Sequence, residues 1–250
     1  MQSQTRVVAV TGAARGIGLG VASYLAAQGL RVALFDKDGA ALDNTVTSLT
    51  QQGFAVRGFV ADMTSGADVK QAVRDAEAWA GPALHLVNNA GAVRDTRFLA
   101  MSDEDWDLVL ATNLRSQFIC CRAMLPAMVE HGYGRIVNMS ARAWLGGFGQ
   151  ANYSAAKGGV VSLTRSLAIE FAAKGVTVNA IAPGIVDTPL FRNFKPEVQQ
   201  KLQATVPVRR IGTPEDVARA VAYFLEPANS YVTGQTLYVC GGRSLSSASV

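Results

Sequence analysis

Short runs rich in β-branched residues alternate with longer helical patterns along the whole chain of 250 residues. Strands are expected at Arg6–Val10, Arg31–Phe35, Ala55–Val60, Leu84–Val87, Arg135–Met139, Thr177–Ile181 and Thr236–Val239. Helices are expected near Gly18–Gln28, Asp38–Gln52, Ser65–Trp79, Asp103–Glu130, Asn152–Ala173 and Pro214–Leu225. Repeated strand–helix–strand units pair their strands in parallel through right-handed crossovers, so helices cover both faces of the sheet. The pattern therefore predicts one doubly wound α/β domain with a seven-stranded parallel sheet, spanning residues 1–250 without a linker or repeat.

The composition suits such a fold. Hydrophobic residues make up 49% of the chain and charged residues only 17%, which is below the usual quarter. No apolar run approaches the length that spans a bilayer, and Met1–Arg6 has no apolar core of a secretion signal. The cysteines Cys120, Cys121 and Cys240 lack the spacing of metal ligands and are typical of buried thiols in a reducing compartment. We therefore expect a cytoplasmic protein with no metal site and no membrane association.

The formal charge of +4 raises the question of nucleic acid binding. The basic residues are scattered, and Arg209-Arg210 is the only adjacent pair. The chain has no basic run with interleaved aromatic residues and no spacing of a recognition helix or zinc finger. The sequence therefore predicts a mildly basic surface and a small-molecule substrate in place of a nucleic acid partner.

A glycine-rich turn, Thr11-Gly12-Ala13-Ala14-Arg15-Gly16-Ile17-Gly18, follows the first strand and opens a helix. Glycines allow a sharp turn and let a pyrophosphate approach main-chain N–H groups at a helix N-terminus. The spacing Gly-x-x-x-Gly-x-Gly differs from the Gly-x-Gly-x-x-Gly of the general dinucleotide fold. An ordinary tight turn is the alternative, but the strand before it and the helix after it favour phosphate binding in a Rossmann-type fold.

Polar residues also stand where later strands end. Asp36, at the end of the second strand, suits an adenosine ribose, and its charge would repel a 2′-phosphate, which favours NAD over NADP. Arg15 and Lys37 are positioned to receive that phosphate instead, and a solvated turn aspartate is a further alternative. Asp62 follows the third strand and Asn88-Asn89-Ala90-Gly91 the fourth, at the carboxyl ends where open α/β sheets bind ligands.

Tyr153 and Lys157 are four residues apart in a helical pattern, so they share one helix face. A neighbouring ammonium favours phenolate, and this predicts a tyrosine pKa lowered from about 10. The pair forms a candidate proton donor and acceptor. By itself, however, Tyr-x-x-x-Lys also occurs on solvated helices without function.

Taken together, these motifs resemble the short-chain dehydrogenase/reductase family over essentially the whole chain. The matching elements are Thr11–Gly18, Asp62, Asn88–Gly91, Asn113, Ser140, Tyr153-x-x-x-Lys157, Pro183-Gly184 and Thr188. The separation of Ser140 from Tyr153, which is 153 − 140 = 13 residues, is the usual one in that family. Each motif is weak alone, whereas their order and spacing together are specific.

The resemblance implies a role for each of four residues. Tyr153 would be the general acid/base, and Ser140 would hydrogen-bond the substrate oxygen as charge develops on it. Lys157 would lower the Tyr153 pKa and hold the nicotinamide ribose, and Asn113 would support a water that leads protons to Lys157. Read alone, Ser140 is a turn serine, Asn113 a buried structural amide and Thr188 a loop residue.

The resemblance also implies which residues surround the ligands. The dinucleotide positions are Gly12, Arg15, Gly16, Ile17, Gly18, Asp36, Asp62, Met63, Asn89, Ala90, Gly91, Tyr153, Lys157, Pro183, Ile185 and Thr188. The substrate positions are Ser140, Arg142, Gln150, Tyr153 and Phe191. NAD is the expected cofactor, and NADP is the less favoured one.

Within the family the sequence is most similar to 3-oxoacyl thioester reductases acting on acyl-carrier-protein or coenzyme A substrates. Asn88–Asp95 and Gly149-Gln150-Ala151-Asn152 carry that similarity, whereas Asp36 is foreign to the NADPH-using members. The prediction is an NAD(H)-dependent oxidoreductase that interconverts 3-hydroxyacyl and 3-oxoacyl thioesters. A dehydrogenase of another secondary alcohol (cyclic, aromatic or sugar-like) and a non-catalytic dinucleotide-binding subunit are the alternatives.

A segment of about residues 188–207 is expected to form a substrate lid. Phe191 and Phe194 would give it an apolar wall. Arg192 and Lys195, helped by Arg209-Arg210, would meet phosphates or would serve only solubility. The resemblance further implies a homotetramer assembled through the two long helices and the region of the last strand.

Overall fold

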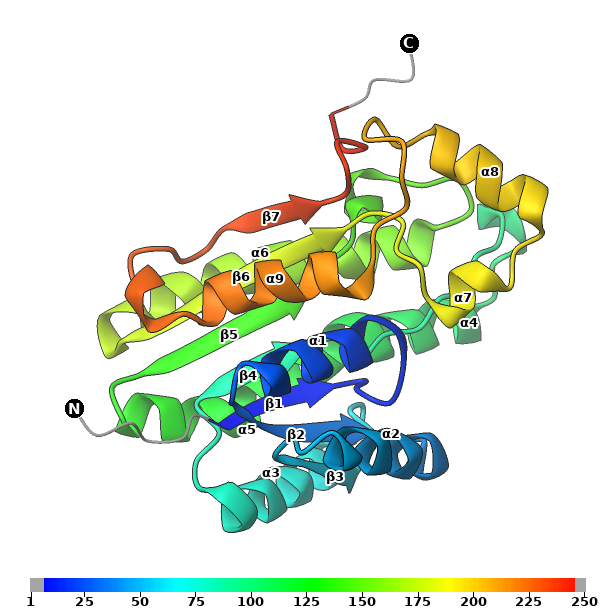
Figure 1. Ribbon diagram of the computed structural model, residues 1–250. Coiled ribbons are helices and arrows are strands. Elements are labelled where there is room, and N and C mark those ends of the chain that lie inside the picture. The colour runs from blue at the N-terminus through cyan, green and yellow to red at the C-terminus, as the bar shows by residue number, and fades with distance from the viewer. Residues whose placement is uncertain (1–6, 246–250) are drawn as a thin grey trace.

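The computed structural model describes residues 7–245, which form one Rossmann-like α/β domain (Figure 1). The strands are β1 (Val7–Thr11), β2 (Arg31–Asp36), β3 (Val56–Val60), β4 (His85–Asn88), β5 (Gly134–Met139), β6 (Val176–Pro183) and β7 (Thr236–Val239). They form a seven-stranded sheet in the order β3-β2-β1-β4-β5-β6-β7, and every neighbouring pair is parallel. The predicted fold class is confirmed. The expected strand start at Arg6 and the segment Met1–Arg6 lie outside the described residues.

Helices cover both faces of the sheet. The long ones are α1 (Gly16–Ala27), α2 (Gly39–Gln51), α3 (Gly66–Ala80), α4 (Asp103–Leu110), α5 (Ser116–Glu130), α6 (Ala151–Phe171), α8 (Pro196–Ala204) and α9 (Pro214–Leu225). The short ones are η1 (Phe98–Ala100), η2 (Ala111–Arg115), η3 (Arg142–Leu145), η4 (Ala172–Lys174), α7 (Pro189–Arg192) and η5 (Pro227–Asn229). One core packs α1, α2 and α9 against the sheet, and the other packs α3, α5 and the end of α6 (Figure 1).

Strand β1 shows why the sequence builds two cores. Val7 and Ala9 belong to the core under α3 and α5, whereas Val8 and Val10 belong to the core under α1 and α9. Successive side chains of a strand point to opposite faces, so a strand covered on both sides must be apolar at every position. This explains the continuous apolar runs that mark the strands in the sequence.

Two regions differ from the sequence-based expectation. The helix expected over 103–130 is interrupted by η2, a π-helical turn at Ala111–Arg115 between α4 and α5. The proposed lid segment contains α7 and α8, each of which has a proline at its start. Proline suits the first turn of a helix because the N–H it lacks has no partner there.

Helix α9 begins where the sequence indicates. Thr213 Oγ accepts the N–H of Asp216 at 3.2 Å, and the Asp216 carboxylate accepts the N–H of Thr213 at 2.8 Å. This reciprocal capping box satisfies two N–H groups that a helix start otherwise leaves without partners. Arg210 also pairs with Asp216. Together, the guanidinium and the capping contacts hold the pKa of the Asp216 carboxyl well below its usual range.

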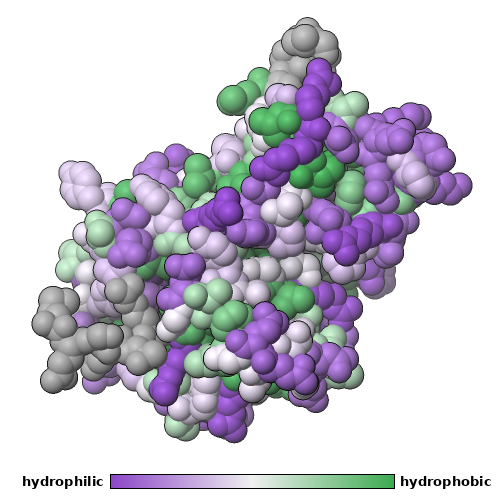
Figure 2. All heavy atoms as spheres, in the orientation of Figure 1, coloured by the Kyte–Doolittle hydropathy of each residue, from purple (hydrophilic) through white to green (hydrophobic). Residues whose placement is uncertain are grey.

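Figure 1 shows α7 and α8 beyond the carboxyl ends of the strands, to which the arrowheads point. Hydrophilic residues cover most of α8 on the face shown in Figure 2. Within residues 7–245, no helix combines the length and the apolar character needed to cross a bilayer.

Candidate active site

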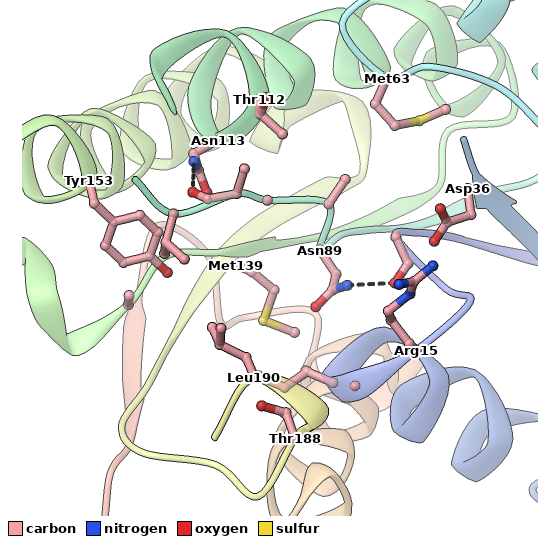
Figure 3. A pocket seen from close by; sticks show the side chains of 18 of the residues that line it. Arg15, Asp36, Met63, Asn89, Thr112, Asn113, Met139, Tyr153, Thr188 and Leu190 are labelled. Carbon is pink, nitrogen blue, oxygen red and sulfur yellow. Dashed lines mark hydrogen bonds between the residues drawn. The ribbon is translucent and has the colours of Figure 1, made fainter. Parts of the chain in front are cut away.

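A cavity of about 700 Å³ opens at the carboxyl ends of the strands (Figure 3). Most of the predicted dinucleotide and catalytic residues line it: Gly12, Arg15, Gly16, Ile17, Asp36, Asp62, Met63, Asn89, Ala90, Gly91, Asn113, Ser140, Tyr153, Lys157, Pro183 and Thr188. Figure 3 shows Tyr153 at one end of the cavity and Asp36 with Arg15 at the other. The fold thus brings together side chains that lie more than 100 residues apart in the chain.

The glycine turn after β1 is packed too tightly for side chains. Gly12 and Gly16 have φ angles of +63° and +59°, a region that glycine adopts without strain. A Cβ atom on Gly12 would lie 2.9 Å from the Cα of Ala90, and one on Gly18 would lie 2.0 Å from the Gly12 carbonyl oxygen. Gly18 therefore packs the helix start against the turn and does not line the cavity itself.

Thr11 and Asn89 fasten this turn to the end of β4. Thr11 Oγ accepts the N–H groups of Asn89 and Ala90 at 2.9 and 3.0 Å. The Asn89 amide donates to the carbonyl oxygens of Thr11 and Gly12 at 3.0 and 3.1 Å (Figure 3). The geometry of the turn is thus fixed by the side chain of Thr11 and by that of Asn89, which lies 78 residues further along the chain.

Asp36 is engaged by the main chain at the far end of the cavity. Its two carboxylate oxygens accept the N–H groups of Ala14 at 3.0 Å and Asp38 at 3.1 Å. Arg15 forms an ion pair with Asp38, whose pKa is lowered by the N–H of Ala41 and by this guanidinium. Both partners of the ion pair are largely exposed, so water screens it.

Ser140 and Lys157 hold one another at the opposite end. Ser140 follows the last residue of β5, and its Oγ donates to the carbonyl oxygen of Lys157 at 2.8 Å. Lys157 Nζ donates to the carbonyl oxygen of Met139 at 2.8 Å and lies 5.6 Å from the centroid of the Tyr153 ring. Ser140 and Lys157 are each 3% exposed, and Figure 3 shows the Tyr153 hydroxyl pointing into the cavity.

The pKa expected for Tyr153 is wrong in this structure. Burial, together with the carboxylate of Asp95, raises the Tyr153 pKa to about 12. Burial also lowers the pKa of Lys157 to about 7, so its ammonium is only partly charged at neutral pH. Desolvation of the phenolate therefore outweighs the attraction of the neighbouring cation, and the sequence could not show how far the fold removes the two groups from water.

Asn113 occupies the π turn between α4 and α5. Its side-chain amide donates to the carbonyl oxygens of Ala92 at 2.7 Å and Val109 at 2.9 Å. Its Oδ1 is buried and accepts no hydrogen bond within residues 7–245. A Cβ on Gly91 would lie 2.7 Å from this oxygen, so only glycine fits opposite it. Single π turns inside α-helices are frequent at functional sites, and this one sets the orientation of Asn113.

Comparison with known proteins gives the family. Residues 12–244 match the family described as "Enoyl-(Acyl carrier protein) reductase". The "(2S)-[(R)-hydroxy(phenyl)methyl]succinyl-CoA dehydrogenase subunit BbsD" of Thauera aromatica is 42% identical over 245 residues, which are 98% of this chain and 99% of that protein. The chain belongs to the short-chain dehydrogenase/reductase family.

Two further relatives of this dehydrogenase/reductase support the assignment. The "3-oxoacyl-[acyl-carrier-protein] reductase FabG" of Escherichia coli (strain K12) is 36% identical over 244 residues, covering 97% of this chain and 98% of that protein. The crystal structure of a single-substitution variant of the actinorhodin polyketide ketoreductase with NADPH matches with a TM-score of 0.92 and 36% identity, covering 98% and 99% of the two chains. The protein is therefore an oxidoreductase that acts on CH–OH groups with a nicotinamide dinucleotide.

Sequence reasoning missed Gln117 in this dehydrogenase/reductase. Gln117 Nε2 donates to the Met139 carbonyl oxygen at 3.1 Å, the same oxygen that accepts from Lys157. The Gln117 side chain is 1% exposed and comes from α5. The available signal was weak: Gln117 directly precedes the short apolar stretch Phe118–Cys121, and a buried amide requires a partner.

Several predicted residues lie outside the cavity. The Gln150 amide donates to Asp95 at 2.8 Å, and the Ile185 carbonyl oxygen accepts the N–H of Gly212 at 3.0 Å. Phe191 is buried against Phe194, with ring centroids 6.4 Å apart. Arg142 comes directly after the cavity-lining residues in the chain, at the start of η3, and does not line the cavity itself.

Leu190 lines the cavity where Phe191 was expected. The two residues are adjacent in the short helix α7, so they point in different directions, and no pattern in the sequence indicates which one faces inward. Thr188 both lines the cavity and caps this helix by accepting the N–H of Phe191 at 3.4 Å.

Proposed function

We propose that this protein is an NAD(H)-dependent oxidoreductase that interconverts a secondary alcohol and a ketone, with Tyr153, Ser140 and Lys157 at the reacting carbon. One observation carries the proposal: a single cavity holds a phenol, a lysine and a serine at one end and a carboxylate at the other. The tight glycine turn between them suits a pyrophosphate, because no side chain caps the main-chain N–H groups at the start of α1.

Each side chain has a role that its contacts support. Tyr153 gives a proton to the ketone oxygen in reduction and takes it back in oxidation. Ser140 lines the cavity and hydrogen-bonds that oxygen when its hydroxyl turns away from the Lys157 carbonyl oxygen, to which it donates in this structure. Lys157 and a water at the buried Asn113 Oδ1 resupply the proton. The nicotinamide dinucleotide, when bound, supplies or accepts the hydride, and the chain aligns it.

The pKa of Tyr153 gives the proposal a pH dependence. With a pKa of about 12, Tyr153 is protonated at neutral pH and ready to act as an acid in reduction. In oxidation it must first lose its proton, so the rate of alcohol oxidation is expected to rise with pH across the alkaline range, while ketone reduction does not. Initial rates in both directions, measured as a function of pH, test this expectation.

The charges at the adenosine end favour NAD. Asp36 presents a carboxylate that would repel a 2′-phosphate, and Arg15, one candidate to receive that phosphate, is already paired with Asp38. Titration with NADH and NADPH by fluorescence should give tighter binding of NADH. Tighter binding of NADPH, the cofactor in the polyketide ketoreductase structure, would show that Arg15 and Lys37 outweigh Asp36.

A 3-hydroxyacyl/3-oxoacyl thioester is the substrate class that we propose. The substrates after which BbsD and FabG are named both carry the reacting oxygen on the carbon β to a thioester, and the similarity to each protein covers nearly the whole chain. The test is a substrate panel read by NADH absorbance, with coenzyme A thioesters, N-acetylcysteamine thioesters, and cyclic and aromatic alcohols side by side. Turnover of the simple alcohols without the thioesters would contradict this substrate class.

The substrate lid at about residues 188–207 and the homotetramer are parts of the same proposal. Leu190 lines the cavity from α7, which supports a lid.

Exposed apolar side chains at Leu99 and at Phe118 of α5 support the burial of apolar surface in an oligomer. Light scattering of the purified protein tests the assembly, and a monomer at working concentration would contradict it. A cytoplasmic location stays a prediction.

A further inference from the structure

Asn152 is a fully buried polar residue that the proposed mechanism does not use. It directly precedes Tyr153 in the first turn of α6, and its exposed fraction is 0%. Its Oδ1 accepts the main-chain N–H of Tyr153 at 2.7 Å. The first N–H groups of a helix have no partner within the helix, so Asn152 satisfies that of Tyr153 from the neighbouring position. The main chain of the proposed acid/base is thus anchored by the side chain beside it.

The amide nitrogen of Asn152 holds two other segments of the chain. Its Nδ2 donates to the carbonyl oxygen of Arg94, which follows β4, at 3.1 Å. It also donates to the carbonyl oxygen of Asp105 in α4 at 3.3 Å. The two acceptors are 58 and 47 residues away in the chain. One side chain therefore joins three segments at one buried point, and a buried amide that is satisfied in this way makes its surroundings rigid.

The segment after β4 that Asn152 holds also forms part of the cavity wall. Ala92 and Val93 line the cavity. The carbonyl oxygen of Ala92 accepts from the Asn113 amide at 2.7 Å, and that of Arg94 accepts from Asn152 at 3.1 Å. Val93 is therefore held between two buried side-chain amides, one acting on the residue before it and one on the residue after it.

Two further hydrogen bonds connect this segment to the start of α6. The N–H of Thr96 donates to the Gly149 carbonyl oxygen at 2.9 Å, and the Gln150 amide donates to Asp95 at 2.8 Å. The bond between Gln150 and Asp95 is exposed, so water competes for both of its partners. The buried amide of Asn152 is the part of this connection that water does not replace.

We propose that Asn152 is a positioning residue, which fixes the spacing between the Tyr153 hydroxyl and the cavity wall at Val93. The inference rests on the proposed function, since it concerns the placement of the acid/base of that reaction. Both Tyr153 and Val93 line the cavity, so a substrate that contacts both is placed by the distance between them. A misplacement of about 1 Å costs about 10²-fold in rate, although Asn152 itself does not line the cavity.

The chain contains a matched control for a purely structural role. Asn179 of β6 is 1% exposed and does not line the cavity. Its Nδ2 donates to the Val232 carbonyl oxygen at 2.8 Å, and its Oδ1 accepts the N–H of Gln235 at 3.0 Å. Asn179 thus connects two segments with the same kinds of hydrogen bond as Asn152. Both N152A and N179A should lower Tm by several degrees, since each leaves buried main-chain groups without a partner.

Steady-state kinetics separates positioning from stability. Reduction of acetoacetyl-coenzyme A by NADH is measured with the full-length variants at a temperature at which all are folded. N152A should lower kcat by about 10- to 100-fold and raise KM about threefold, while the dissociation constant for NADH changes less than about twofold. N179A should keep kcat within about twofold. N152S, whose hydroxyl can still accept the Tyr153 N–H, should lose less activity than N152A.

Hydrogen exchange, read by mass spectrometry, tests the same connection without turnover. In N152A, exchange should become faster in residues 92–96 and 151–154, whereas in N179A it should become faster around residues 232–235. The proposal is overturned if N152A and N179A lose kcat equally, or if exchange in residues 92–96 is the same in N152A as in the wild type. If N152A does not fold, N152S is judged by the same two criteria. A wild-type protein that binds NADH but reduces no substrate contradicts the proposed function instead, and the exchange measurement still decides whether Asn152 holds the segment.

Discussion

The two ends of the cavity are built in opposite ways. At the reacting end, Ser140 and Lys157 are buried and each hydrogen-bonds a main-chain carbonyl oxygen. At the adenosine end, Arg15 and Asp38 form an ion pair that stands largely in solvent. Desolvation sets the pKa values at the first end, whereas local hydrogen bonds and screened charges act at the second.

This difference predicts that substitutions at the buried end of the cavity have larger effects on activity and stability than those at the exposed end. A group that is buried and fixed has few alternatives, so its loss is not compensated by water. An exposed charge is replaced by solvent and counterions at little loss. The following predictions test that contrast, from the largest expected effect to the smallest.

Tyr153→Phe removes only the hydroxyl that points into the cavity. We expect kcat to fall by about 10³-fold or more, because general acid–base catalysis contributes about 10²–10⁴-fold. The dissociation constant for NADH should change less than about threefold, since the ring and its packing remain. Turnover close to the wild-type level would remove Tyr153 from the acid/base role.

Asp36→Asn removes the charge at the adenosine end and keeps one of the two acceptor oxygens, which now serve the N–H groups of Ala14 and Asp38. The ratio of NADH to NADPH affinity should fall by about 10- to 50-fold, as the repulsion of a 2′-phosphate disappears. Asp36→Ala should change the ratio similarly but also loosen the turn at Ala14, whose N–H would lose its acceptor. An unchanged ratio in Asp36→Asn would mean that the carboxylate does not select the cofactor.

Lys157→Met should make the protein more stable while it removes activity. The Lys157 pKa is about 7 when folded and 10.5 in an ordinary lysine, so between these values the unfolded chain binds more protons. Wild-type stability should therefore rise as the pH increases from about 7 to about 10. In Lys157→Met the free energy of unfolding at pH 7 should be about 1 kcal/mol higher, because a desolvated ammonium is removed.

Urea unfolding of both proteins over this pH range measures the effect. Gln117 continues to donate to the Met139 carbonyl oxygen in the variant, so that acceptor is not left without a partner. The same pH dependence in Lys157→Met and the wild type would assign the effect to another group.

Arg15→Gln should have the smallest effect, because its ion pair with Asp38 is exposed. We expect a change in Tm of less than about 1 °C and a loss of NADPH affinity of about threefold, with NADH affinity unchanged. Scanning calorimetry and fluorescence titration measure both. A change in Tm of several degrees would show that the two ends of the cavity do not differ in the way described above.

The sequence predicted the fold well because the apolar runs of the strands and the helical patterns between them were both clear. Strands covered on both sides are apolar throughout, and the predicted boundaries of β2 and β7 differ from the observed ones by at most one residue. The π turn at Ala111–Arg115 was not predictable, because it contains neither glycine nor proline and depends on tertiary contacts of Asn113. The start of α8 was signalled by Pro196 but was not assigned.

The cavity residues were predicted where a motif fixes the backbone, as at Gly12 and Tyr153. Orientation within a short element was not predictable, which is why Leu190 and not Phe191 lines the cavity. The direction of the Tyr153 pKa shift depends on burial, which the spacing of two residues on a helix does not reveal. Arg142 was predicted next to the substrate, and the structure places it at the start of η3, directly after the cavity-lining Ser140 and Ala141.

The π turn has a consequence for how this chain tolerates insertions and deletions. It holds one residue more than a regular helical turn would need, and each α-helical residue adds a rotation of about 100°. Deleting one residue from Ala111–Arg115 would give a straighter and locally better-formed rod from Asp103 to Glu130. The same deletion would swing the Asn113 amide away from Ala92 and Val109, so improved regularity here would come at the expense of the active centre.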